Sequence, residues 1–273
     1  MALMKVLITV KTYPTLSNKY DELVCTAGFR EDGTWIRIYP IPFRKLEYDK
    51  QYKKYDWIEI DLEKNTSDFR SESYKPKSID DEISIIGSLS TEDNWSLRKE
   101  IVLKNIHENL KNLIAEAKDK NKLTSLAVFK PKKIIDFTIE KVDSNWDKKK
   151  LDKLKANAQQ LNLFKNSENP FEVVNKLPYK FSYKFLDNEN QESTLMIEDW
   201  EICALYWKML EKHSKNEIKA CDEVKKKYFY DFAKTKDLYF YLGTTREFHL
   251  IAPNPFVIIG VFYPKIEIQG SLF

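Results

Sequence analysis

Residues 23–39 read LVCTAGFREDGTWIRIY, two strand-like segments separated by a short polar turn. Glu31-Asp32-Gly33-Thr34 supplies the turn, because glycine tolerates the positive φ that tight hairpin turns demand. Similar strand-like segments precede and follow this hairpin in the sequence, at residues 6–10 and 57–62. The N-terminal part is therefore predicted to form an antiparallel or mixed β-sheet.

The middle of the chain combines helical and strand patterns. Leucines and isoleucines recur at helical spacing over residues 95–117 and predict one amphipathic helix, whereas residues 134–142 alternate as a half-buried strand does. Residues 146–169 are polar and lysine-rich and are predicted to form a surface excursion. Residues 130–165 are the most basic window, which is typical of an exposed helix and is also compatible with phosphate binding.

The C-terminal part returns to strands after two helices. Residues 179–185 and 195–197 predict a hairpin, Asp199 is placed to cap a helix, and a second amphipathic helix follows over residues 218–232. Strands at the chain end, residues 238–242 and 256–262, are predicted to pair antiparallel.

The predicted fold class is α+β, with a mixed or antiparallel sheet or barrel-like core and several flanking amphipathic helices. We expect a single module over residues 1–273. A possible subdivision is a β-rich part at 1–90, a helical and basic insertion at 91–176, and a C-terminal α+β part at 177–273 that completes the N-terminal sheet.

Composition narrows the functional classes. Hydrophobic residues make up 42% and charged residues 32% of the chain, which predicts a packed core. Aromatic residues reach 14% while glycines number 6, which argues against glycine-rich nucleotide-binding folds. The formal net charge is only +3, so a binding site for a polyanion would have to be a local patch.

Cysteine and histidine usage predicts neither a disulfide framework nor a metal site. The chain has 3 cysteines without CxxC spacing and 3 scattered histidines. No apolar run approaches the roughly 18 residues that a membrane helix requires. We therefore expect a cytoplasmic protein with no membrane partner, no metal and no cofactor; the sequence assigns no oligomeric state.

Basic, hydroxyl and aromatic side chains gather at predicted strand ends and at one helix start, where binding residues are common. Arginine binds phosphate through its planar fork, and an aromatic ring can stack on a base. The residues predicted to bind nucleic acid are Lys11, Thr12, Arg37, Tyr39, Arg44, Arg70, Trp200, Thr244, Thr245 and Arg246. Turns, hairpins and surface ion pairs would explain the same residues without any ligand.

Glu198-Asp199-Trp200-Glu201 places three carboxylates around a tryptophan at a predicted helix start. Acidic residues there complement the helix dipole, and an Asp N-cap stabilises a helix by about 1 kcal/mol. A carboxylate beside an apolar wall can also act as a general base or stabilise a developing cation. Both interpretations remain open from the residues alone.

Several strings in this order resemble a family of bacterial DNA glycosylases found in phage defence, which attack glucosylated hydroxymethylcytosine in T-even phage DNA. The strings are Val10-Lys11-Thr12-Tyr13-Pro14, Arg37-Ile38-Tyr39-Pro40-Ile41-Pro42-Phe43-Arg44, Asp199-Trp200-Glu201, Leu242-Gly243-Thr244-Thr245 and Gly260-Val261-Phe262-Tyr263-Pro264. The resemblance spans nearly the whole chain, although none of the strings defines a catalytic mechanism.

The resemblance implies an enzyme that extrudes a modified cytosine from phage DNA and hydrolyses its N-glycosidic bond, leaving an abasic site. Such a reaction needs a carboxylate near the cationic sugar. Asp199 is the expected carboxylate, with Glu201 or Glu22 as the alternative. Competing hypotheses are a non-catalytic nucleic-acid reader, an ADP-ribosyltransferase acting on DNA, and a nuclease.

Overall fold

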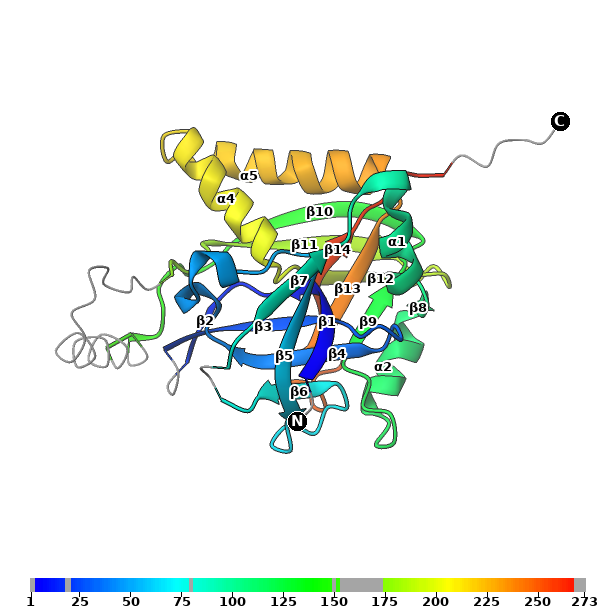
Figure 1. The fold of residues 1–273 in the computed structure, drawn as a ribbon. Helices are drawn as coiled ribbons and strands as arrows, with labels where there is room; N and C mark the ends of the chain where they lie inside the picture. The colour runs from blue at the N-terminus through cyan, green and yellow to red at the C-terminus, as the bar shows by residue number, and fades with distance from the viewer. Residues whose placement is uncertain (1–2, 18–20, 79–80, 149–150, 153–173, 268–273) are drawn as a thin grey trace.

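The computed structural model describes residues 3–17, 21–78, 81–148, 151–152 and 174–267 (Figure 1). These residues form an α+β fold with a barrel-like sheet, which confirms the predicted fold class. Most of the predicted surface excursion at 146–169, and with it the end of the basic window, lies outside the described residues.

Five N-terminal strands close into a barrel. Their order is β1 (Leu3–Lys11), β3 (Asp21–Phe29), β4 (Trp35–Ile41), β6 (Ser73–Pro76) and β5 (Asp56–Lys64). Strand β5 pairs back onto β1, and β4 pairs with β6 in parallel, so the sheet is closed and mixed. The short strands β2 (Thr15–Ser17) and β7 (Ser84–Ser88) pair with β3 and β5. The predicted Gly33 turn links β3 to β4, with a φ of 84°.

Alternate side chains fill the barrel. Ile58 and Ile60 of β5 are buried, while Glu59 between them is partly exposed, as the two-residue period of a strand requires. Strand β1 is buried on both faces, because Ile8 packs inside the barrel whereas Leu7 and Val10 pack with residues of the C-terminal half. The two halves thus share a core along β1, the strand that leads to the candidate site.

Two further sheets form from the rest of the chain. One has the order β14 (Phe256–Phe262), β13 (Tyr239–Thr244), β9 (Leu126–Phe129) and β8 (Ile106–His107). The other has the order β10 (Lys133–Lys141), β11 (Tyr179–Leu186) and β12 (Glu192–Met196). The predicted antiparallel pairing of the last two strands is confirmed. The C-terminal strands do not complete the N-terminal sheet as expected, because β13 uses its two edges for β14 and β9.

The helices flank these sheets. They are α1 (Glu92–Val102), α2 (Leu110–Lys118), α4 (Trp200–Lys212), α5 (Glu217–Lys225) and the π-helix η3 (Lys226–Ala233), with 3-10 turns η1 (Phe43–Lys45) and η2 (Tyr48–Lys50). Figure 1 shows α5 and η3 running along the sheet that contains β10. None of the helices in the described part of the chain is long and apolar enough to cross a bilayer.

The single helix predicted over residues 95–117 is wrong. The chain leaves helical geometry after Val102, and Ile106 and His107 pair with β9. Asn109 then caps a new helix, its side chain accepting a hydrogen bond from the Asn112 amide at 2.8 Å. Apolar spacing matched a helix on both sides of this break, but the spacing alone did not reveal the intervening strand.

Candidate functional site

One charged cluster joins the barrel to helix α4. Asp199 caps α4 as predicted, its side chain accepting a hydrogen bond from the Glu201 amide at 3.3 Å. The Lys54 Nζ atom lies 3.0 Å from both Asp199 carboxylate oxygens and 2.9 Å from Glu201 Oε2. Thr12, just beyond β1, forms an isolated antiparallel bridge with Asp199. Lys54 therefore holds two carboxylates at the end of β1.

Solvent exposure separates the two carboxylates. The Asp199 side chain is 0% exposed and that of Lys54 is 6% exposed, whereas the Glu201 side chain is 44% exposed. Of these three groups, only Glu201 is accessible to a ligand arriving from solvent.

Burial also sets the protonation of the cluster. Burial raises the pKa of Asp199 to about 6; Lys54 opposes this rise and Glu201 adds to it. Burial alone would lower the pKa of Lys54, but the charges of Asp199 and Glu201 raise it above its ordinary value. Lys54 is thus a permanent cation, and a perturbed acid beside it is typical of functional sites as well as of structural ion pairs.

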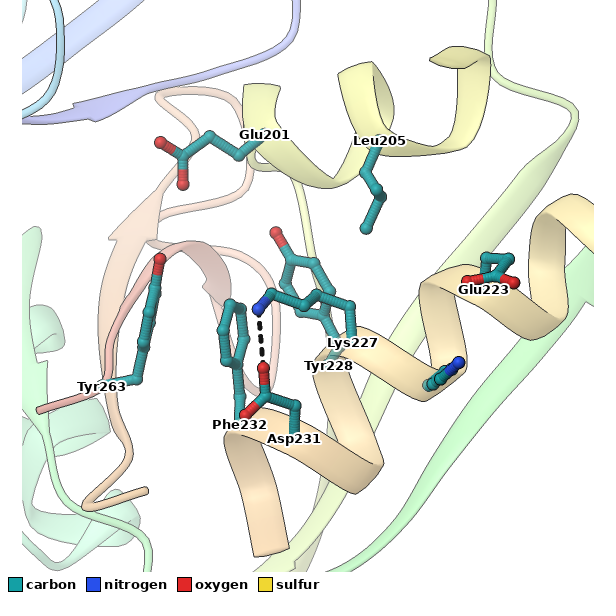
Figure 2. Close-up of a pocket in the computed structure, with 9 residues that line it drawn as sticks. Glu201, Leu205, Glu223, Lys227, Tyr228, Asp231, Phe232 and Tyr263 are labelled. Carbon is teal, nitrogen blue, oxygen red and sulfur yellow. Dashed lines mark hydrogen bonds and ion pairs between the residues drawn. The ribbon is translucent and has the colours of Figure 1, made fainter. Parts of the chain in front are cut away.

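Glu201 also lines a pocket of about 390 Å³ between α4, η3 and the segment after β14 (Figure 2). The rings of Phe232 and Tyr263 stack there, with centroids 3.8 Å apart. Figure 2 shows the hydroxyl ends of Tyr228 and Tyr263 pointing toward the side of the pocket where Glu201 lies. The remaining lining residues are Leu205, Glu223, Lys226, Lys227 and Asp231. The pocket therefore combines an aromatic wall with a carboxylate at one side.

A second group of predicted residues lies on the barrel side of α4. The Lys11 Nζ atom lies 4.3 Å from the Phe43 ring centroid and 5.7 Å from that of Trp200, and it donates a hydrogen bond to the Tyr52 carbonyl at 3.0 Å. Trp200 packs edge-on against Phe43, with ring centroids 5.5 Å apart. The structure thus brings Lys11, Thr12, Asp199, Trp200 and Glu201 together.

Arg37 and Arg70 belong to a different, buried cluster. Arg37 donates to Ser125 Oγ at 2.7 Å and to the Ser125 and Thr244 carbonyls at 3.2 and 3.4 Å. Arg70 binds Asp68 and also donates to the Thr244 carbonyl. Their exposed fractions are 2% and 7%, so both guanidinium groups are committed to contacts inside the protein. Their predicted contact with phosphate has no support in this arrangement.

The remaining predicted residues lie elsewhere. Tyr39 is 38% exposed, and Arg44, Thr245 and Arg246 are exposed. The backbone at Glu22 pairs with Leu16, while the Glu22 side chain lies outside the described residues. Within the residues that the structure describes, no three His, Cys, Asp or Glu side chains are grouped as metal ligands would be.

Sequence reasoning missed several residues of the site. Lys54 follows another lysine in a polar stretch, which resembles any solvated surface segment. Tyr228 and Phe232 lie on the predicted apolar stripe of a helix and were expected only to pack in the core. Tyr263 falls inside a string that supports the family resemblance, and that was the one available signal for it.

Comparison with known families divides the chain at the start of β8. Residues 2–104 match a family described as a domain of unknown function, DUF8758, and residues 106–273 match a second, DUF8757. Lys54 comes from the first region and both of its carboxylate partners from the second. A search of curated proteins found no match. Because the second match covers more than half of the chain, the protein belongs to the DUF8757 family.

Proposed function

We propose that the protein is a DNA glycosylase in which Glu201 is the catalytic carboxylate. The observation that carries the proposal is an exposed carboxylate, fixed by a buried lysine, beside an aromatic pocket. Cleavage of an N-glycosidic bond develops positive charge on the sugar, and a carboxylate stabilises that charge or activates the attacking water. Lys54 keeps Glu201 oriented for either role.

Asp199, the carboxylate first expected from the sequence, takes a positioning role in this proposal. Its side chain is fully buried, so it does not reach a sugar without rearrangement. It instead neutralises Lys54 and caps the helix that carries Glu201. A positioning role and a catalytic role are thus divided between two neighbouring carboxylates.

The pocket suits an extruded base. Its volume of about 390 Å³ lies within the range of about 300–1,000 Å³ that is common for small-molecule sites. Phe232 backs the partly exposed Tyr263 ring, and stacking of a base on an aromatic ring of this kind stabilises it by roughly 1–3 kcal/mol. Stacking of this size offsets the few kcal/mol needed to turn a base out of the duplex.

The polar groups of the pocket favour a base that carries a sugar. Burial raises the pKa values of Tyr228 and Tyr263, so both hydroxyls remain protonated donors at neutral pH. Together with Glu223 they can pair with sugar hydroxyls. Lys226, exposed at the same pocket, can meet a phosphate. Glucosylated hydroxymethylcytosine in T-even phage DNA is the substrate we propose, with phage defence in the bacterial cytoplasm as its setting.

The test is to incubate the purified protein with T-even phage DNA and, separately, with unmodified DNA, and to identify released bases by mass spectrometry. We expect release of the glucosylated base from phage DNA alone. Binding of both DNAs without any release would instead establish a non-catalytic reader. Release of nucleotides or transfer of a group to DNA would indicate a nuclease or a transferase.

A further inference from the structure

Lys11 occupies an environment that differs from that of an ordinary surface lysine. It ends β1 half-buried, with its amine over the Phe43 ring and near Trp200. Its amine donates a hydrogen bond to a neutral carbonyl, that of Tyr52, at 3.0 Å. Among the described residues, no carboxylate oxygen lies within the 4.0 Å of an ion pair from its Nζ atom. Within the part of the chain that the structure describes, the amine is held by rings and a carbonyl rather than by a counter-ion.

Burial and the charge of Lys54 favour the neutral form of this amine. Burial, and next the positive charge of Lys54, lower the pKa of Lys11 to about 8, although Glu201, Asp199 and Asp56 act in the opposite direction. A lysine desolvated by apolar groups and placed near another cation is the arrangement that makes an amine nucleophilic. At a pKa of about 8, roughly a tenth of Lys11 is a free amine at pH 7.

We propose that Lys11 is an amine nucleophile that forms a Schiff base with the aldehyde carbon of an abasic deoxyribose. The neutral amine attacks C1′, a C–N bond forms, and the carbonyl oxygen leaves as water. Loss of the C2′ proton to a base then allows the C3′–O bond to break, which cleaves the strand; hydrolysis of the imine restores the amine. This activity rests on the proposed function, since base release would supply the abasic sugar.

The partly exposed position of Lys11 is compatible with this chemistry. A carbonyl carbon can approach the amine from solvent, whereas Lys54 is enclosed by its two carboxylates. The charges of Lys11 and Glu201 act on each other, so the two groups belong to one electrostatic site. Glu201 would act in base release and Lys11 in the strand cleavage that follows.

The test uses DNA that contains a preformed abasic site, so that it does not depend on base release by this protein. The full-length protein is mixed with this DNA and borohydride, which reduces an imine to a stable covalent adduct. We expect an adduct that resists denaturing electrophoresis and that peptide mass spectrometry locates at Lys11. Because the adduct is mapped on the wild-type protein, this result does not depend on whether a variant folds.

Two variants make the test specific. Lys11→Arg keeps the positive charge but has no amine for a Schiff base, so the adduct should be lost. Lys5→Arg alters an exposed lysine of the same strand and should leave the adduct unchanged. No adduct with wild-type protein, an adduct on another lysine, or an undiminished adduct with Lys11→Arg would overturn the proposal. An adduct at Lys11 without base release from phage DNA would support Lys11 as the nucleophile and would contradict the proposed glycosylase function.

Discussion

Two buried charged clusters connect the barrel to the C-terminal half, and they differ in how fully their charges are satisfied. Around Arg70, hydrogen bonds from Arg70 and Ser73 outweigh burial and bring the pKa of Asp68 down to about 2. Around Lys54, burial prevails and the pKa of Asp199 rises to about 6. The first cluster stabilises the ionised form of Asp68, whereas the second favours the protonated form of Asp199.

The geometry explains this difference. Asp68 accepts hydrogen bonds from the Arg70 fork and from Ser73 Oγ at 2.7 Å, within a few residues of chain. Asp199 shares one lysine with Glu201, and among the described residues its side chain accepts one further hydrogen bond, from the Glu201 amide. A satisfied cluster is suited to holding structure. A shared lysine with one exposed carboxylate is suited to chemistry, and the following predictions test that division.

The largest effect on stability is expected for Arg70→Met. Removing Arg70 leaves Asp68 buried without its main partner, which typically costs about 3–5 kcal/mol. Urea unfolding at pH 7 measures the loss. Lys75→Met, which breaks the exposed Lys75–Glu63 pair, is the matched control and should cost less than about 1 kcal/mol. Equal losses for the two variants would show that the Arg70 cluster is not structural.

A smaller loss of folding stability is expected for Lys54→Met. Buried carboxylates can neutralise themselves by taking up a proton, so we expect a loss of roughly 2 kcal/mol at pH 7. The loss should shrink at pH 5, because Asp199 protonates readily with its raised pKa. Urea unfolding of wild type and variant at the two pH values tests this. A loss of stability that is the same at both pH values would contradict the raised pKa of Asp199.

The pH dependence of Asp199 should be visible against Asp199→Asn. Between the ordinary pKa of 3.8 and about 6, the folded state keeps a proton that the unfolded state releases. Stability therefore falls as pH rises through this window, by roughly 1–2 kcal/mol relative to the variant. Glu198, whose pKa is also raised by burial, contributes equally to both proteins. If the stability of the wild type rose with pH relative to the variant in this window, the raised pKa of Asp199 would be contradicted.

Features that depend on neighbouring residues could be predicted from the sequence, whereas contacts between residues far apart in the chain could not. Four of the five barrel strands, the Gly33 turn and the Asp199 cap depend on neighbouring residues, and the sequence indicates them, whereas the short strand β6 was not predicted. Lys54 meets Asp199 across 145 positions, a contact that no local pattern encodes. Arg37 was expected to bind nucleic acid, but it is buried against Ser125, just before β9, and Thr244, at the end of β13.

The most direct test of the central claim compares Glu201→Gln with Glu211→Gln on glucosylated phage DNA under single-turnover conditions. Both residues lie on α4, and Glu211 pairs only with exposed Lys215 among the described contacts, so Glu211→Gln should alter stability by less than about 0.5 kcal/mol. Glu201→Gln keeps the shape of the side chain that contacts Lys54, and its folding is checked by urea unfolding. We predict that Glu201→Gln abolishes base release while DNA binding persists, and that Glu211→Gln releases the base at the wild-type rate. Wild-type release by Glu201→Gln would contradict the assignment of Glu201 as the catalytic carboxylate.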